Sequence, residues 1–226
     1  MNEKKQFIAA AIDGPAGAGK STIARTAAKE LGFIYIDTGA MYRSIGLACL
    51  NKSIDPGDAD AVEALLPDIA ISIVFKDGEQ HIILNGNDVS DDIRTESVSM
   101  AASRVSAVPA VRAFLLELQR GFARENNVIM DGRDIGTVVL PDAQVKIFLT
   151  ASPESRARRR TDQLAEKGIQ ADYQAVLDDI IKRDYNDTHR ETAPLKAADD
   201  AVLVDTTELT LPESIDAVTS IIKEKL

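Results

Sequence analysis

The chain alternates between short apolar runs and longer stretches in which apolar residues recur every three or four positions. The apolar runs cover residues 7–12, 33–36, 128–130, 145–149 and 202–204. Runs of this kind are typical of parallel strands that are buried on both faces. The periodic stretches between them predict amphipathic helices. We therefore expect an α/β fold with a three-layer core, in which helices cover a parallel five-stranded sheet.

One stretch interrupts this pattern with an alternation of period two. Apolar residues alternate with other residues from position 69 to 75, a turn is predicted at residues 76–79, and residues 81–84 run back. An Asn-Gly pair at residues 85–86 adds a second turn signal. Antiparallel strands within an α/β pattern indicate an insertion. We therefore expect a single domain over residues 1–226 that carries a small antiparallel β subdomain at residues 65–100.

The first apolar run leads into a glycine-rich loop that fits the phosphate-binding pattern G-x-x-x-x-G-K-[ST] without a mismatch, and a predicted helix follows it. The glycines let consecutive backbone N–H groups turn toward one polyanion, and the helix dipole adds a positive end. In such loops the lysine reaches the β- and γ-phosphates of the nucleotide, and the hydroxyl after it holds Mg²⁺. The expected ATP-binding residues are Gly14, Pro15, Ala16, Gly17, Ala18, Gly19, Lys20, Ser21 and Thr22, with Ser21 as the Mg²⁺ ligand.

Composition narrows the classes of partner. The 226 residues include 36 acidic and 26 basic ones, so the net charge is -10, which argues against a nucleic-acid surface and against binding to anionic membranes. The single cysteine, Cys49, cannot form an internal disulfide, and no Cys/His cluster has metal-ligand spacing. No apolar run approaches the length of a membrane span, and residues 1–5 lead into a strand instead of a signal sequence. We expect a cytoplasmic monomer that acts on small molecules.

Arginines gather after the fourth predicted strand, on a helix that begins near Pro153 and on a second helix that begins near Asp172. In an acidic chain with a phosphate loop, this cluster favours anion binding over a solvated basic face. Phosphoryl transfer between phosphate groups brings negative charges together, and arginines offset them. A GTP switch is disfavoured because the guanine-reading pattern N-K-x-D fails at Ile54 and no D-x-x-G occurs.

The nature of the acceptor leaves two kinase hypotheses open. A phosphate acceptor is mostly ionised near neutral pH and requires no general base. A hydroxyl acceptor would need a carboxylate to position it, and Asp37, at the end of the second predicted strand, is the candidate. A third hypothesis is a nucleotide-binding module without catalytic activity.

Several segments together resemble the bacterial cytidylate kinases, a family of phosphate-loop nucleoside monophosphate kinases. They cover residues 13–22, 37–43, 131–139 and 193–195, and the inserted stretch at residues 84–90, with residues 93–95, resembles the enlarged monophosphate-binding subdomain of that family. The likeness runs nearly end to end. It implies transfer of a phosphoryl group from ATP, with Mg²⁺, to CMP or dCMP, giving CDP or dCDP and ADP.

The resemblance also implies roles for individual residues. Arg43, Arg133 and Arg190 match the residues that clamp the CMP phosphate, and Thr38 matches a position beside them in the site. The residues that match those reading cytosine are Ser103, Arg112 and Asp134, and those that match ribose contacts are Arg183 and Asp187. Residues 152–190 would form a helical lid and the helix that follows it. The implied catalytic set is Lys20, Arg133, Arg156, Arg160 and Arg190.

Overall fold

The computed structural model describes residues 7–76, 79–166 and 168–226. The chain divides into two compact units. One unit, here called the phosphate-loop unit, contains the chain up to Tyr35 and the part from Ala123 to Leu226. The other, here called the inserted unit, is Ile36–Phe122. The expected course of residues 1–5 lies outside the described part of the chain.

The phosphate-loop unit is built on a five-stranded sheet with the strand order β2-β6-β1-β7-β8. The central strand β1 runs parallel to its neighbours β6 and β7, and β7 runs parallel to β8, as predicted. The strands are β1 (Ala9–Asp13), β2 (Ile34–Asp37), β6 (Val128–Gly132), β7 (Val145–Thr150) and β8 (Val202–Asp205). Every residue of β1 and β6 is buried, which explains the apolar runs that precede Asp13 and Asp131 at their carboxyl ends.

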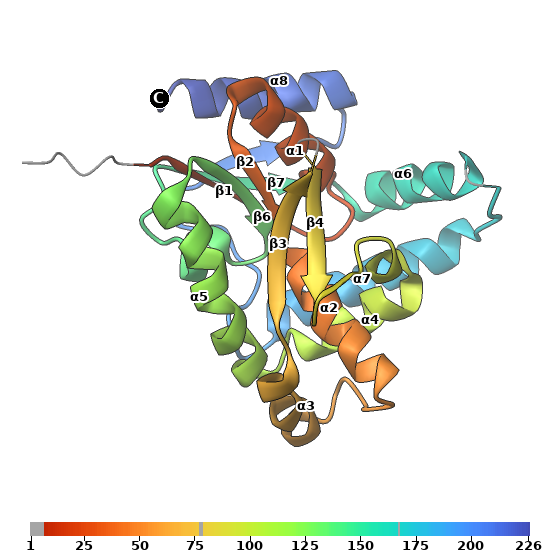
Figure 1. The fold of residues 1–226 in the computed structure, drawn as a ribbon. Coiled ribbons are helices and arrows are strands. Elements are labelled where there is room, and N and C mark those ends of the chain that lie inside the picture. Colours follow the sequence, from red (N-terminus) through yellow and green to blue (C-terminus); the bar gives the residue numbers. More distant parts are fainter. Residues whose placement is uncertain (1–6, 77–78, 167) are drawn as a thin grey trace, which may run out of the picture. The chain divides into compact units, whose positions relative to one another are not determined.

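Two of the helices in this unit begin or end at typical capping residues. The helices are α1 (Lys20–Leu31), α6 (Pro153–Glu166), α7 (Tyr173–His189) and α8 (Leu211–Lys223). Gly32 ends α1 in the left-handed conformation, and the Asp172 carboxylate caps α7 by accepting from the N–H of Ala175 at 2.8 Å. Apolar residues of α1 and α8 share one core with β1 and β7, while α6 and α7 pack on each other (Figure 1).

One short element was not predicted. Two residues separate β6 from a π-helical turn at Ile135–Val139, in which the N–H of Leu140 bonds the carbonyl of Ile135 at 2.7 Å. π-Helical turns are uncommon and often occur at functional sites. This turn begins one residue after Asp134.

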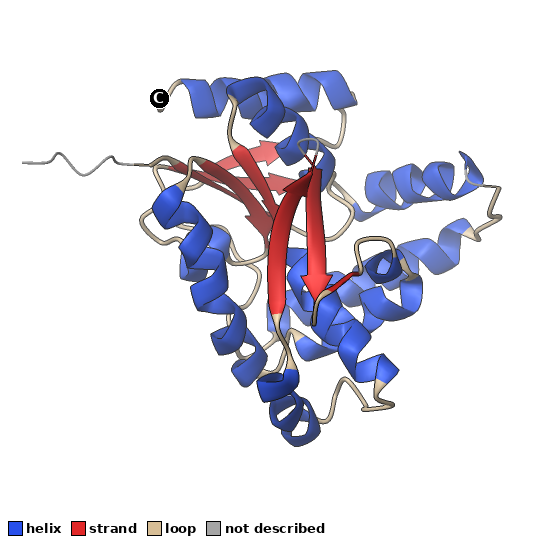
Figure 2. Cartoon of the chain, viewed as in Figure 1, coloured by secondary structure: helices blue, strands red, loops and turns tan. Residues whose placement is uncertain are grey.

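The inserted unit holds the three-stranded antiparallel sheet that the sequence predicts, with the order β3-β4-β5 (Figure 2). Asn85 and Gly86 form its second turn with φ of 49° and 85°, which is the conformation that an Asn-Gly pair favours. The first predicted turn includes residues 77–78, which lie outside the described part of the chain. The elements are α2 (Thr38–Asn51), α3 (Ala59–Leu65), β3 (Ile71–Lys76), β4 (Glu79–Leu84), β5 (Asn87–Asp88), α4 (Glu96–Val105) and most of α5 (Pro109–Glu125), with 3-10 turns at Leu66–Asp68 and Asp92–Arg94.

This unit extends beyond residues 65–100 because α2 and α4 pack against each other. No helix in the described part of the chain is long and apolar enough to span a membrane.

We expect alanine substitutions at two glycines to change the free energy of unfolding in opposite directions. A Cβ built on Gly14 would lie 1.9 Å from the carbonyl oxygen of Leu149, and the φ of Gly14 is 151°. Gly14→Ala should therefore destabilise the fold by about 3 kcal/mol or more, as expected for overpacking combined with backbone strain. A Cβ on Gly121, within α5, meets nothing within 4 Å. Gly121→Ala is the matched control and should stabilise the fold by about 0.5–1 kcal/mol. Denaturant unfolding measures both; equal effects would contradict the close approach of Gly14 and Leu149.

Candidate active site

The glycine-rich loop joins the carboxyl end of β1 to the first turn of α1. Gly19 precedes the helix in the left-handed conformation, with φ of 87°, and has no side chain to cap the helix. The N–H groups of the first turn have no intrahelical acceptors, so they remain available to an anion at the positive end of the helix dipole. The loop thus has the backbone geometry of a phosphate site.

The Lys20 side chain is folded back into this loop. Its ammonium donates to the carbonyl oxygens of Gly14 at 2.7 Å and Pro15 at 2.8 Å, and the residue is buried. Burial, with the Arg133 guanidinium nearby, lowers the pKa of Lys20 to about 7, although neighbouring carboxylates oppose the shift. A phosphate group beside the ammonium would favour its charged form.

Asp131 lies near the carboxyl end of β6 and connects the loop to a neighbouring strand. Its two carboxylate oxygens accept separate hydrogen bonds, one from the Ser21 hydroxyl at 2.9 Å and one from the Tyr35 hydroxyl at 2.9 Å. Asp131 is buried. The paired oxygens of Ser21 and Asp131 are of the kind that Mg²⁺ prefers.

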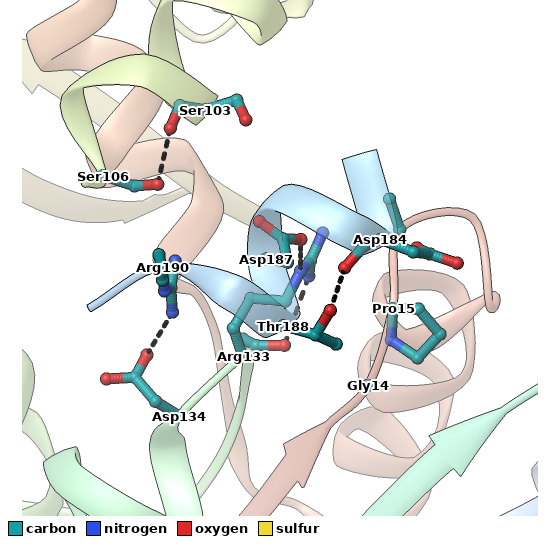
Figure 3. A network of polar contacts seen from close by, with 12 residues as sticks. Gly14, Pro15, Ser103, Ser106, Arg133, Asp134, Asp184, Asp187, Thr188 and Arg190 are labelled. Atoms are coloured by element: carbon teal, nitrogen blue, oxygen red, sulfur yellow. Dashed lines mark hydrogen bonds and ion pairs between the residues drawn. The ribbon is translucent and has the colours of Figure 1, made fainter. Parts of the chain in front are cut away.

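Arg133 and Asp187 form an ion pair between the end of β6 and the last turn of α7 (Figure 3). The Arg133 Nε donates to a carboxylate oxygen of Asp187 at 2.8 Å. Burial acts to raise the pKa of Asp187, but Arg133, Arg190 and Arg183 outweigh it and hold this pKa below its usual range. Asp187 is therefore ionised at neutral pH.

Asp134 and Arg190 lie beside this pair. A guanidinium nitrogen of Arg190 is 3.8 Å from a carboxylate oxygen of Asp134, and both side chains are at most 8% exposed (Figure 3). The Arg190 Nε also donates to the carbonyl of Ala193 at 2.8 Å. Of the predicted site residues, the structure thus brings Arg133, Asp134, Asp187 and Arg190 together, while Arg183 lies one turn before Asp187 on α7 and is half-buried.

The arginines of α6 do not form one uniform basic face. Arg156 is buried and donates to the carbonyl of Ala16 in the phosphate loop at 2.9 Å, as well as to the Asp184 carboxylate at 3.0 Å. Arg159 bonds Thr206, which follows β8. Arg158 and Arg160 are exposed. Arg156 and Arg160, one turn apart, thus differ in environment, which their spacing did not indicate.

In the inserted unit, Asp37 and Arg43 form an ion pair of 2.8 Å. The Asp37 carboxylate also accepts from the N–H of Ala40 at 3.0 Å, so Asp37 caps α2, as the sequence allowed. Thr38, the first residue of α2, is buried. Each Asp37 oxygen thus already accepts one hydrogen bond, from Ala40 or from Arg43.

The predicted cytosine-reading residues of the inserted unit lie on α4 and α5. The Arg112 guanidinium donates to the carbonyl of Ser106 at 3.1 Å and lies 5.6 Å from the centre of the Tyr42 ring. Ser103, on α4, is half-buried, and its carbonyl accepts from the Ser106 hydroxyl at 2.8 Å (Figure 3).

Sequence reasoning missed three residues of the site. Asp131 belongs to a segment that resembles the family, and its place at the carboxyl end of a strand is the signal that points to it. Nothing in the local pattern distinguishes Tyr35 or Asp184, because their partners lie 96 and 28 residues away.

Comparisons with known proteins bear on this site. A family model described as "Cytidylate kinase" matches residues 10–224. A cytidylate kinase of Lactobacillus johnsonii is 53% identical over 215 residues, which cover 95% of this chain and 94% of that protein. One of Caldicellulosiruptor saccharolyticus is 52% identical over 208 residues, 92% of each chain, and one of Mycolicibacterium paratuberculosis is 48% identical over 219 residues, 96% of each chain. The resemblance inferred from the motifs is confirmed, and the chain belongs to the cytidylate kinase family.

Proposed function

We propose that this protein transfers the γ-phosphoryl group of ATP to CMP or dCMP, giving ADP and CDP or dCDP. The observation that carries the proposal lies within the phosphate-loop unit. Arg133 and Asp134 directly follow β6, which pairs with the strand that enters the phosphate loop, and both face partners at the end of α7. Guanidinium groups suit a phosphate acceptor, and a carboxylate suits the amino group of cytosine.

The chemistry follows from the charges. A phosphate oxygen of CMP attacks the γ-phosphorus of ATP in line, a new phosphorus–oxygen bond forms, and the bond to the oxygen between the β- and γ-phosphorus breaks as ADP leaves. The attacking oxygen is already ionised near neutral pH, so no side chain has to remove a proton. Lys20 stabilises charge on the transferred group, while Arg133 and Arg190 hold the CMP phosphate with Arg43 and Thr38 of the inserted unit. Arg156 and Arg160 offset charge on the ATP phosphates.

The remaining contacts to CMP set its orientation. Asp134 accepts from the cytosine amino group, and Arg112 and Ser103 of the inserted unit complete the contacts to the base. Arg183 and Asp187 bind the ribose. In support, the Asp134 and Asp187 side chains are both buried, and each carboxylate faces an arginine.

The residues present fit Mg²⁺ as the companion of ATP. The Ser21 hydroxyl and the Asp131 carboxylate bond each other at the end of the phosphate loop, as the two protein groups that hold Mg²⁺ in phosphate-loop enzymes would. Among the described residues, no group of three or more His, Cys, Asp or Glu side chains could hold a metal ion alone. Mg²⁺ takes few protein ligands and otherwise binds phosphate oxygens and water. When bound, it would neutralise charge on the β- and γ-phosphates.

Tyr35→Phe tests this assignment. The change removes the hydroxyl that holds Asp131 at 2.9 Å, so the carboxylate loses an orienting contact. Groups that orient a metal ligand typically contribute tenfold or more to affinity, so the apparent Kd for Mg²⁺ should rise about tenfold. Titration of the ATP-bound protein with Mn²⁺, followed by electron paramagnetic resonance, measures affinity independently of turnover. Tyr185→Phe, at an exposed position of α7, is the control. Equal affinity in both variants would exclude a role for Tyr35.

The function itself is tested with ATP, Mg²⁺ and a panel of acceptors, namely CMP, dCMP, UMP, AMP and a hexose. We expect efficient transfer to CMP and dCMP. Faster transfer to the hexose would indicate a hydroxyl-directed kinase instead, and ATP binding without transfer to any acceptor would indicate a non-catalytic module. The expected cytoplasmic location and monomeric state stay predictions.

A further inference from the structure

Asp13, the last residue of β1, is a buried carboxylate with no part in the mechanism above. One of its oxygens accepts from the N–H of Ile135 at 2.8 Å, and the other accepts from the N–H of Gly136 at 2.8 Å. These partners are more than 120 residues away in the sequence. Asp13 therefore joins the strand that enters the phosphate loop to the turn that leaves β6.

The two N–H groups belong to the start of the π-helical turn Ile135–Val139. The first N–H groups of a helical turn lack partners within the turn, and the residue before it often supplies a side chain to satisfy them. Here that residue is Asp134, with φ of -146° and ψ of 27°, and it makes no such side-chain bond. Asp13 caps the turn instead, which leaves the Asp134 side chain to face Arg190.

A buried carboxylate caps a turn at the cost of losing its hydration. Burial raises the pKa of Asp13 to about 6, the charge of Asp134 adds to this shift, and the two backbone N–H groups and Lys20 oppose it. The Lys146 side chain also packs at Gly136, where a Cβ would lie 3.2 Å from it. Burial and the Asp134 charge therefore disfavour the ionised form of Asp13. Groups held in such unfavourable surroundings are concentrated at functional sites.

We propose that Asp13 is a positioning residue for phosphoryl transfer. By capping the turn, it fixes Arg133 and Asp134 relative to Gly14, the next residue of the chain, whose carbonyl receives the Lys20 ammonium. The inference rests on the proposed function, because it assigns Asp13 a role in holding the acceptor. Displacements of about 1 Å in a bound reactant can reduce rates by 10², so the cap matters for turnover.

Asp13→Asn is the first test. An amide has one acceptor oxygen, so its NH₂ group would face one of the two N–H donors and release it. Loss of one hydrogen bond to a charged group should raise KM for CMP about tenfold and lower the CMP-over-UMP ratio of kcat/KM. KM for ATP should change by less than about twofold, because the nucleotide meets the loop backbone and not this carboxylate. Asp58→Asn is the matched control, since Asp58 caps α3 through the N–H of Ala61.

A second measurement covers the case in which Asp13→Asn does not fold. In the wild-type protein, the amide ¹H and ¹⁵N shifts of Ile135 and Gly136 should titrate together with a midpoint near pH 6. The CMP-over-UMP ratio should fall with the same midpoint as the pH is lowered. Titration of the substrate phosphate cancels in this ratio, because CMP and UMP carry the same phosphate.

The outcomes separate the two claims. A wild-type protein that does not phosphorylate CMP overturns the proposed function and this inference with it. An active wild-type protein whose folded Asp13→Asn variant keeps the wild-type ratio and KM for CMP overturns the positioning role alone. If the Asp13→Asn variant is unfolded, the wild-type protein decides. A CMP-over-UMP ratio that stays constant with pH while the amides of Ile135 and Gly136 titrate also overturns the positioning role.

Discussion

Replacing Lys20 with alanine is expected to lower kcat for CMP by about 10² or more, the usual order for losing one preorganised electrostatic contact to a transition state. The ammonium lies inside the phosphate loop, where it bonds the carbonyls of Gly14 and Pro15. In a buried site its charge acts on the transferred group with little screening by water.

The same substitution should leave the protein folded. Burial opposes the charge of Lys20 and lowers its pKa, so removing the ammonium relieves a desolvation cost. This gain offsets the loss of the hydrogen bonds to the carbonyls of Gly14 and Pro15. Circular dichroism and denaturant unfolding check the fold, and steady-state kinetics give kcat. Lys29→Ala, at an exposed position of the same helix, is the control and should retain wild-type kcat. A folded Lys20→Ala variant with near-normal turnover would contradict the assignment of the loop.

Replacing Asp134 with asparagine is expected to narrow the preference for CMP over UMP. Cytosine presents an amino donor at N4 and acceptors at N3 and O2, whereas uracil presents an acceptor at O4 and a donor at N3. A carboxylate and a guanidinium match the first pattern and repel the second. Such mismatches can give discrimination up to about 10⁴ to 10⁵, and we expect the wild-type preference to lie below that ceiling. An amide offers either its oxygen or its nitrogen, so the variant should accept both bases more evenly.

The structure also offers Asp134 a purely structural role, because Arg190 lies 3.8 Å from its carboxylate. The two roles differ in kinetics. If Asp134 only holds Arg190, Asp134→Asn lowers kcat/KM for CMP and UMP by the same factor, since both acceptors carry the same phosphate. If it reads the base, the loss falls mainly on CMP. Asp216→Asn, at an exposed position of α8, is the control for loss of one negative charge.

Local sequence patterns predicted the elements of the fold well. The five parallel strands, the antiparallel insertion, the Asn85-Gly86 turn and the cap at Asp37 all occur as expected. Each of these depends on a few consecutive residues, so propensity and period suffice to find them.

The contacts that shape the site could not be predicted in this way. Asp131 and Asp134 stand three residues apart in one segment, yet one bonds Ser21 and the other faces Arg190. The first N–H of the π-helical turn bonds Asp13, and the buried Arg156 bonds Asp184 and Ala16. These pairings join distant segments, and only the folded chain decides which side chains meet. The resemblance to a family supplied expected roles for several of them, but not their environments.

The central claim is transfer of a phosphoryl group from ATP to CMP, and one labelling experiment tests it most directly. The protein is incubated with [γ-³²P]ATP, Mg²⁺ and CMP, and the products are separated by thin-layer chromatography. We expect the label to appear in CDP, with one ADP formed for each CDP. Label released as inorganic phosphate, or ATP left intact in the presence of CMP, would contradict the account.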